Sequence, residues 1–194
     1  MSGSEGLRAA GGSAEPGAAP EAASDAPRGR LEHGAGAVLA ALVRSGATVA
    51  VAESLTGGLL AAEFVSVPGA SRAFRGSVTA YATELKSSVL GVDAELLAAK
   101  GAVDPQVAAQ MAEGVRWLMG ADYGVATTGV AGPDPQDGQP VGTVYLAVAG
   151  PSGLFDSSLR LSQGRATIRR RTVEAALELL DRALDSNRSR GPEG

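Results

Sequence analysis

The sequence contains no cysteine, a single histidine (His33), and only two lysines, Lys86 and Lys100, among its 17 basic residues. Without cysteine, disulfides, thiolate metal sites, iron–sulfur clusters and cysteine nucleophiles are excluded, and the chain suits a reducing compartment. A Ser–His–Asp triad would depend on His33, at the edge of a segment poor in core-forming residues. Because lysine can act as a neutral base and arginine cannot, the two lysines are candidates for chemistry. The alternative is that drift towards arginine in a GC-rich genome left only two lysines by chance.

Charge and hydropathy exclude further classes. The 17 basic and 21 acidic residues give a net charge of −4, which argues against general nucleic-acid binding. No stretch approaches the roughly 18 consecutive apolar residues of a membrane span, so no membrane partner is expected. Residues 1–36 contain no Val, Ile, Phe, Tyr or Trp and no apolar signal-peptide core. We therefore expect a cytoplasmic protein.

The length of 194 residues fits one domain with tails. The Ala/Gly/Ser/Pro-rich N-terminus cannot bury enough apolar surface to offset its ordering entropy. We predict a disordered tail over residues 1–30, a folded domain over residues 31–187 and a frayed C-terminus over residues 188–194.

Hydrophobic patterning predicts an alternation of strands and helices within the folded part. Buried strands are expected at 48–52, 74–81 and 123–127, and a hairpin at 142–149 and 154–161. Helices are expected at 39–46, 59–65, 83–90 with Thr83 as N-cap, 93–100, 104–119 with Asp104 as N-cap and an inward Leu118, and 165–186. This order predicts a three-layer α/β/α domain with a mixed sheet.

Two glycine-containing turns follow predicted strands, where α/β proteins bind ligands. The first, residues 53–58, also opens a helix whose unpaired N–H groups suit a phosphate or a developing oxyanion. Ser54 lies at the mouth of the strand, as a nucleophile would. An ordinary capped turn, with Ser54 or Thr56 as N-cap, explains the same residues. The second turn, residues 128–134, is neither a Walker A motif nor a Rossmann fingerprint.

Three further side chains stand out. Lys86 follows Tyr81 by five residues, and a desolvated lysine there would have a lowered pKa and could serve as the base for a serine or threonine. A solvated helix lysine is the plainer alternative. Arg165 is expected in a loop, where its guanidinium could hold a phosphate. The basic run at residues 169–171 is interpreted as a solvated face for at least two of its three arginines.

Several short motifs occur in a fixed order. They are A-E-S-L-T-G-G at 52–58, P-G-A-S at 68–71, F-R-G at 74–76, V-T-A-Y at 78–81, E-L-K at 84–86, L-G-V at 90–92, G-A-V at 101–103, M-A-E-G at 111–114, T-G-V-A-G-P at 128–133 and P-V-G-T-V at 140–144. Together they resemble the CinA C-terminal domain family of nicotinamide-nucleotide amidohydrolases, over about residues 35–185. One motif alone would be weak evidence, whereas the ordered set is specific.

This resemblance implies a function. Family members hydrolyse the nicotinamide amide of nicotinamide mononucleotide (NMN), giving nicotinic acid mononucleotide and ammonia in pyridine-nucleotide salvage. No metal and no organic cofactor are expected, the partner is the small-molecule nucleotide, and we expect a homo-oligomer. Longer members carry a preceding nucleotide-handling domain, so this chain is similar to the stand-alone form.

The resemblance also implies a site, because Lys86 falls on the family's Tyr-x-x-x-x-Lys position. We predict that Lys86 is the base, with Tyr81 relaying or orienting the proton. Ser54 is the first choice of nucleophile and Ser71 the second, and attack by water with Glu53 as base is the alternative. The predicted substrate-binding residues are Thr56, Gly57, Thr128, Gly129 and Arg165.

The chain departs from the family pattern at three places. Asp104 stands where serine is usual, Leu55 replaces a frequent cysteine, and residues 134–138 replace a glycine-rich stretch. None of these changes removes a candidate catalytic residue.

Two other functions remain open from the sequence. One is a non-catalytic nucleotide-binding or regulatory module linked to competence or DNA damage. The other is a sugar- or pterin-nucleotide transferase, which would normally use a metal and clustered acids, and Asp134 and Asp137 form only a loose cluster. The hydrolase is favoured because a decayed module would not need the full set of intact side chains, namely Ser54, Ser71, Tyr81, Lys86, Thr128 and Arg165.

Overall fold

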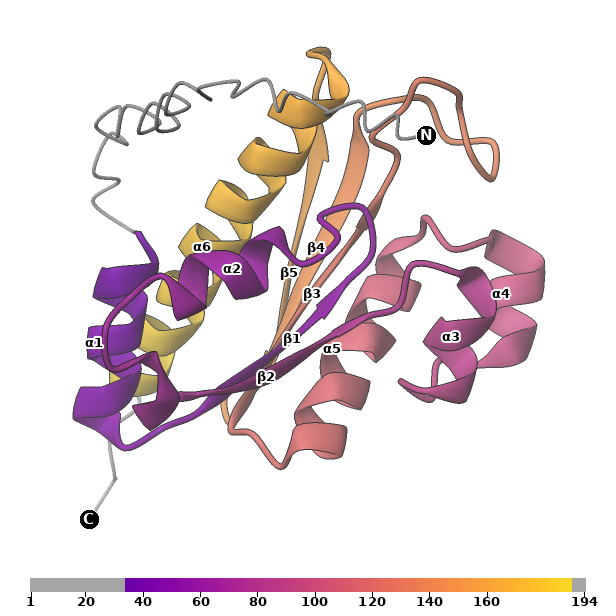
Figure 1. Ribbon diagram of the computed structural model, residues 1–194. Helices are drawn as coiled ribbons and strands as arrows, with labels where there is room; N and C mark the ends of the chain where they lie inside the picture. Colours follow the sequence, from indigo (N-terminus) through magenta and orange to yellow (C-terminus); the bar gives the residue numbers. More distant parts are fainter. Residues whose placement is uncertain (1–33, 190–194) are drawn as a thin grey trace, which may run out of the picture.

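The computed structural model describes residues 34–189 (Figure 1). The predicted tail over residues 1–30 and His33 lie outside the described residues, as do residues 190–194 of the predicted frayed C-terminus. Arg188 and Ser189 belong to the last helix, α6 (Arg165–Ser189), which extends three residues past the predicted end at 186. None of the helices within residues 34–189 has the length and apolar character needed to cross a membrane.

A five-stranded mixed sheet forms the middle layer, in the order β2-β1-β3-β4-β5. β1 (Val49–Glu53) pairs in parallel with both β2 (Phe74–Thr79) and β3 (Tyr123–Gly129). β4 (Thr143–Gly150) and β5 (Gly153–Arg160) add an antiparallel hairpin to β3. The predicted mixed sheet and hairpin are therefore confirmed, and the carboxyl ends of the three parallel strands meet at one edge.

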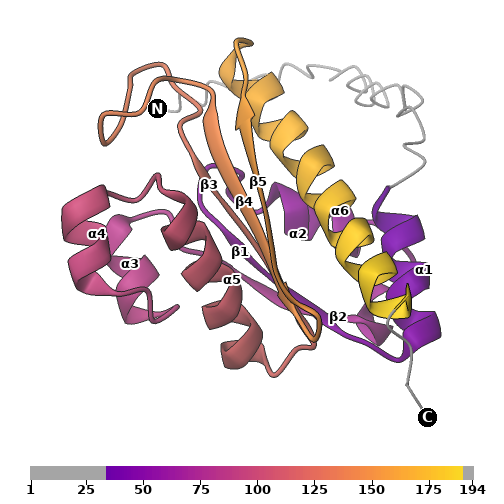
Figure 2. The ribbon, with the colours of Figure 1, turned by 180° about the vertical axis from the view of Figure 1, so that it is seen from behind.

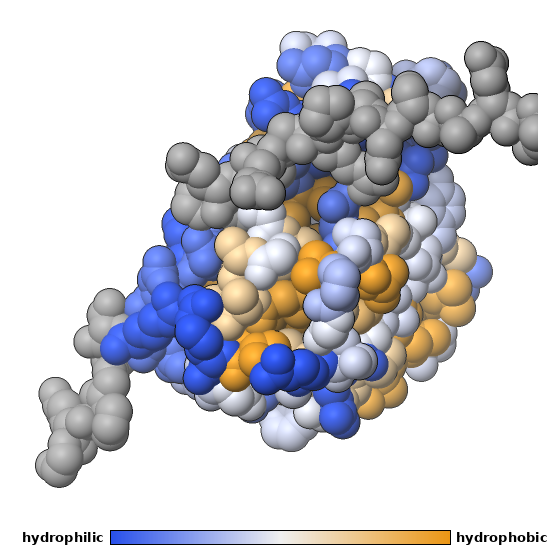
Figure 3. Space-filling model, turned by 60° about the vertical axis from the view of Figure 1, so that its left-hand side comes forward, coloured by the Kyte–Doolittle hydropathy of each residue, from blue (hydrophilic) through white to orange (hydrophobic). Residues whose placement is uncertain are grey.

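Helices cover both faces of the sheet, which confirms the three-layer α/β/α architecture. One layer consists of α1 (Ala35–Ser45), α2 (Leu59–Val65) and α6, and the opposite layer of α3 (Thr83–Ser88), α4 (Ala94–Lys100) and α5 (Pro105–Met119) (Figures 1 and 2). A short 3₁₀ helix, η1 (Ala70–Arg72), precedes β2. The outer surface on the side of α1 and α2 mixes apolar and hydrophilic residues (Figure 3).

The two faces of the sheet are packed with side chains of different size. Residues facing α1, α2 and α6 are mostly large or β-branched, including Val49, Val51, Val125, Val144, Leu146 and Val148. Residues facing α5 are mostly alanine, namely Ala50, Ala52, Ala126, Ala147 and Ala149. The small face lets α5 approach closely, and a Cβ on Gly124 would lie 2.0 Å from the carbonyl oxygen of Ala112.

Two local predictions are wrong and one is confirmed. Thr83 is the first residue of α3, and Ala82 occupies the N-cap without a side-chain hydrogen bond. Leu118 is 52% exposed on α5 because the helix rotates it away from the alanine face. Asp104 caps α5 as predicted, accepting a 2.8 Å hydrogen bond from the Gln106 N–H.

Candidate active site

A cavity of about 470 Å³ lies at the carboxyl ends of β1 and β3. Its walls are Ser54 and Leu55 after β1, residues 81–83 after β2, residues 129–136 after β3, and Arg165 at the start of α6. Cavities of this size suit small-molecule ligands. The site thus lies where the strand-end argument expected it.

Ser54 and Lys86 meet at this cavity. Lys86 comes from α3 and is only 1% exposed, yet its Nζ lies 3.2 Å from the Oγ of Ser54. The Nζ also donates a 2.8 Å hydrogen bond to the carbonyl of Ala80. A neutral amine in this place can donate to Ala80 and accept the Ser54 hydroxyl proton at the same time.

Burial lowers the pKa of Lys86 from 10.5 to about 8, and the nearby carboxylates of Asp137 and Glu84 oppose the shift. Desolvation disfavours the charged ammonium, which is the physical cause of the lowering. Lys86 is therefore still mostly protonated at neutral pH, but its neutral minority is far larger than for an ordinary lysine. The fully solvated lysine considered from the sequence is not what the structure contains.

The turn after Ser54 is fixed from both ends. The Ser54 N–H donates to the carbonyl of Thr127 at 3.0 Å, and the Gly57 N–H returns to the carbonyl of Ser54 at 3.1 Å. Between them, the N–H groups of Leu55 and Thr56 donate to no acceptor within the described part of the chain. Ser54 and Leu55 both line the cavity, and the unpaired Leu55 N–H belongs to the residue directly after Ser54.

Glu53 occupies the start of α2. Its carboxylate is fully buried and accepts hydrogen bonds from the N–H groups of Gly58 at 3.0 Å, Leu60 at 3.1 Å and Ala61 at 2.9 Å. The prediction that this helix N-terminus supplies oxyanion donors is therefore wrong. The same contacts leave Glu53 turned away from the cavity, which removes the support for Glu53 as the base for a water molecule.

Arg165 and Tyr81 form one wall of the cavity. Arg165 is the first residue of α6 rather than a loop residue, and it is exposed. Its guanidinium donates to the carbonyl of Gly132 at 2.6 Å and to the Tyr81 hydroxyl at 3.2 Å. Tyr81 is 60% exposed, and its hydroxyl faces Arg165. A proton relay from Ser54 through Tyr81 has no hydrogen bond to support it among the described residues.

Ser71 lies far from Lys86. It is an exposed residue of η1, at the end of the sheet where β2 begins, because the N–H of Val49 bonds the carbonyl of Ala73. Ser54 follows the opposite end of the paired strands, after Glu53. The prediction that Ser71 reaches the same pocket as Lys86 of the same chain is therefore wrong.

The predicted substrate-binding residues divide into two groups. Gly129 and Arg165 line the cavity. Thr56 and Thr128 are fully buried behind it, where the Thr56 hydroxyl bonds that of Thr127 at 2.8 Å and the Thr128 hydroxyl donates to the carbonyl of Ala102 at 2.6 Å. Gly57 is exposed, and a Cβ added to it would lie 3.3 Å from the guanidinium of Arg169. These three residues support the walls rather than face a ligand.

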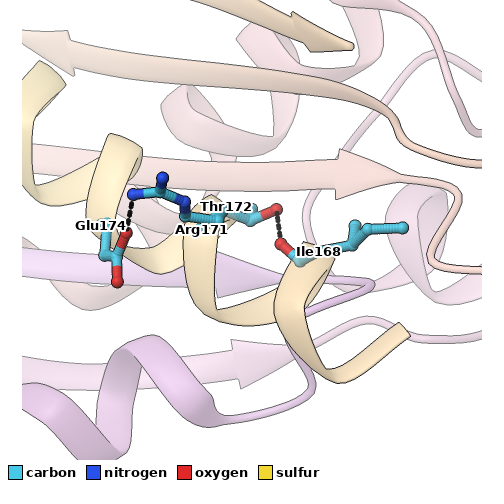
Figure 4. A network of polar contacts seen from close by, with 4 residues as sticks. All are labelled: Ile168, Arg171, Thr172 and Glu174. Carbon is cyan, nitrogen blue, oxygen red and sulfur yellow. Dashed lines mark hydrogen bonds and ion pairs between the residues drawn. The ribbon is translucent and has the colours of Figure 1, made fainter. Parts of the chain in front are cut away.

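Two residues that the sequence did not single out complete the surroundings. Asp137 accepts a 2.7 Å hydrogen bond from the Ala102 N–H and contributes to the potential at Lys86. Arg169 belongs to the basic run that was interpreted as mostly solvated. That interpretation holds for the other two arginines, since Arg170 is exposed and Arg171 forms a surface ion pair with Glu174 at 3.0 Å (Figure 4).

The same close view shows a side-chain hydrogen bond within α6. Thr172 is fully buried, and its hydroxyl donates to the carbonyl of Ile168 at 2.8 Å, one turn earlier (Figure 4). No group of three or more acidic or histidine side chains within residues 34–189 is arranged to hold a metal ion.

Fold and site together define a three-layer α/β domain with a serine–lysine pair at the carboxyl edge of its sheet. The CinA C-terminal domain, compared as a family model, matches residues 32–184. The chain belongs to the CinA C-terminal domain family, which confirms the resemblance seen in its motifs.

Relatives agree with this assignment. A CinA-like protein of Frankia casuarinae is 57% identical over 149 residues, which cover 77% of this chain and 34% of that protein. A CinA-like protein of Gloeobacter violaceus is 50% identical over 153 residues, covering 77% and 36%. The chain therefore spans about a third of the length of these curated relatives.

Solved structures share the fold. The competence/damage inducible protein CihA of Agrobacterium tumefaciens aligns with a TM-score of 0.74 at 37% identity, covering 78% of this chain and 93% of that one. A CinA-superfamily protein of Klebsiella pneumoniae aligns with a TM-score of 0.75 at 31% identity, covering 78% and 96%.

Proposed function

We propose that the domain hydrolyses the carboxamide of NMN to nicotinic acid mononucleotide and ammonia. The observation that carries this proposal is the 3.2 Å approach of the Lys86 Nζ to the Oγ of Ser54, which lines the cavity. Burial of Lys86 lowers its pKa to about 8. A serine becomes a nucleophile when an adjacent base can take its proton. The motif resemblance to nicotinamide-nucleotide amidohydrolases supports the choice of a nucleotide amide as substrate, and the match to the CinA C-terminal domain supports that resemblance.

The proposed reaction proceeds in two halves. Neutral Lys86 takes the Ser54 proton while Oγ attacks the carboxamide carbon, giving a tetrahedral intermediate. The ammonium of Lys86 then protonates the departing nitrogen, and ammonia leaves behind an ester on Ser54. Water attacks this ester with Lys86 again as base, releasing the carboxylic acid and restoring the serine.

The developing oxyanion needs hydrogen-bond donors that are already in place. The free Leu55 N–H follows the nucleophile directly, which is the arrangement found at nucleophile elbows. The Thr56 N–H is the second unpaired donor of the same turn. These two groups replace the α2 N-terminus, whose donors Glu53 occupies.

Arg165 is the proposed phosphate ligand. Its guanidinium bonds two neutral acceptors, Gly132 and Tyr81, at the mouth of the cavity. A nucleotide phosphate would exchange these for charge-assisted bidentate bonds, which are about twice as strong.

Arg165→Ala is expected to raise KM for NMN by about 10- to 100-fold with little change in kcat, because a hydrogen bond to a charged group contributes about 1.5–3 kcal/mol. Steady-state kinetics with NMN and with nicotinamide riboside, which lacks the phosphate, measure the effect. Arg170→Ala, an exposed neighbour on the same helix, is the control. An equal loss with both substrates would show that Arg165 does not bind the phosphate.

Asp137→Asn is expected to move the acid limb of the kcat/KM profile to lower pH by about half to one unit. The Asp137 carboxylate raises the pKa of Lys86, so its neutralisation lowers that pKa and leaves more neutral amine at a given pH. Asparagine can still accept from the Ala102 N–H and tolerates the φ of 51° at this position. Asp134→Asn, in the same cavity wall, should leave the profile unchanged. A shift to higher pH would contradict this account of the Lys86 environment.

The decisive test is ammonia release from NMN by the purified chain, with Ser54→Ala as the matched inactive variant. Conversion of NMN to nicotinic acid mononucleotide by the wild type alone supports the proposal. Some relatives are named putative competence-damage inducible proteins, and binding of NMN without any ammonia release would favour a regulatory module instead.

A further inference from the structure

Arg169 reaches from α6 to the turn that follows Ser54. Its Nε donates to the carbonyl of Leu55 at 2.9 Å, and its Nη2 donates to the carbonyl of Thr56 at 2.6 Å. Arg169 is half-buried, and it lies one helical turn after Arg165 on the same side of α6. Neither acceptor is charged. Arg169 therefore binds two backbone carbonyls next to the candidate nucleophile and no carboxylate in these contacts.

The planarity of the peptide bond converts these two contacts into control of the turn's donors. In a trans peptide the N–H points opposite to the C=O of the preceding residue. Holding the Leu55 carbonyl therefore points the Thr56 N–H away from Arg169. Holding the Thr56 carbonyl likewise points the Gly57 N–H away from Arg169. In that direction the Gly57 N–H donates to the Ser54 carbonyl at 3.1 Å.

The Ser54 carbonyl extends this restraint on orientation to the Leu55 N–H, which belongs to the same peptide unit. Because it accepts from Gly57, the Leu55 N–H of the same peptide unit points away from the Gly57 N–H. Without Arg169, the Leu55 carbonyl would lose its bond from the Arg169 Nε, and the peptide unit at 56–57 would keep the bond from the Gly57 N–H and the 3.3 Å bond from the Leu59 N–H to the Thr56 carbonyl.

We infer that Arg169 is a positioning residue that sets the Leu55 and Thr56 N–H groups for the oxyanion of the amide substrate. This inference rests on the proposed function. Arg169 touches neither the cavity nor the reacting atoms, so its contribution appears in the transition state and not in substrate binding. It also ties the turn to the helix that carries Arg165.

Arg169→Ala and Arg169→Lys are expected to lower kcat for NMN by about 10- to 100-fold, since misplaced donors cost this much, with KM within about threefold. Lysine can hold only one of the two carbonyls well and should retain more activity than alanine. An NMN analogue with an aldehyde in place of the carboxamide forms a tetrahedral adduct with a serine. Its affinity should fall with kcat, whereas that of nicotinic acid mononucleotide should stay constant.

Gly57→Ala tests the same contact from the other side. An added Cβ would press on the Arg169 guanidinium at 3.3 Å, in a residue whose φ is 56°. Gly46→Ala is the matched control, because its φ of 69° imposes similar strain with nothing within 4 Å of the Cβ. Only the Gly57 variant should lower kcat.

Amide hydrogen exchange gives a readout that does not depend on turnover. The Gly57 N–H should lose its protection in Arg169→Ala and keep it in Arg170→Ala. Unchanged protection, unchanged kcat, or an equal loss of affinity for product and aldehyde would overturn the inference. Failure of the wild type to release ammonia would instead overturn the proposed function, and the exchange result would still decide whether Arg169 holds the turn.

Discussion

Lys86→Arg is expected to lower kcat for NMN hydrolysis by about 10²–10⁴-fold, the usual contribution of a general base. Arginine preserves the positive charge and much of the length of the side chain, but it cannot lose its proton and therefore cannot accept one from Ser54. Ammonia release at about pH 9, above the wild-type lysine pKa of about 8, measures the effect most sharply because the wild-type amine is then largely neutral.

The other lysine of the chain provides the control. Lys100 is exposed at the end of α4, and Lys100→Arg should behave as wild type. The wild-type kcat/KM should also rise with pH through about 8 and then level off, because only the neutral amine is active. If Lys86→Arg kept kcat within threefold of wild type, Lys86 would not be the base.

Ser54→Ala is expected to abolish turnover, with a loss of at least about 10³-fold, because removal of a nucleophile leaves only binding and oxyanion stabilisation. The expected covalent intermediate, an ester of the nicotinate on Ser54, should be visible by mass spectrometry after rapid acid quenching of the wild type. It should be absent from the variant. Binding of NMN should change little, because Arg165 and the cavity walls remain.

Ser71→Ala separates this mechanism from its nearest competitor. Ser71 is exposed at the opposite end of β2, so the variant should keep its activity. Loss of turnover in Ser71→Ala together with activity in Ser54→Ala would reverse the assignment of the nucleophile.

Local sequence signals predicted much of the fold. The apolar run at β1, the glycine-rich turn after it and the hairpin turn at residues 150–153 each depend on a few neighbouring residues, and the structure places all three as expected. The Asp104-Pro105 pair likewise marked the start of α5, since a capping carboxylate and a proline at the first helical position act locally. Ser54 was chosen from the sequence for the same reason, as a residue at a strand end, whereas Lys86 was chosen as one of only two lysines, in the helix that follows the next strand.

The misplaced residues depend on contacts between distant parts of the chain. Arg169 bonds the carbonyl of Thr56, 113 residues away, and nothing in the basic run at 169–171 distinguishes it from its solvated neighbours. Thr128 was expected to face the substrate, but its hydroxyl turns to Ala102. Side-chain direction at a strand end depends on which segment packs beside it, and a local pattern does not contain that information.

Ser71 was misplaced for a geometric reason. It is close to Tyr81 in sequence, but the six-residue strand β2 separates them. A strand rises about 3.3 Å per residue, so β2 carries the chain roughly 20 Å across the sheet. Glu53 was misjudged because an acid beside a serine suggests chemistry, whereas its carboxylate completes the hydrogen bonds of α2.

The loop between β3 and β4 is closed at its base by two hydrogen bonds, from the Val130 N–H to the Thr143 carbonyl and from the Gly142 N–H to the Val130 carbonyl, both 2.8 Å long. The loop between them projects from the sheet, and its first part, residues 130–136, forms one wall of the cavity. Lengthening such a loop costs little free energy, since doubling its length adds only about 0.6 kcal/mol. Evolution and protein engineering can therefore redesign this wall, and with it the range of substrates admitted, while β1, which precedes Ser54, and α3, which carries Lys86, stay as they are.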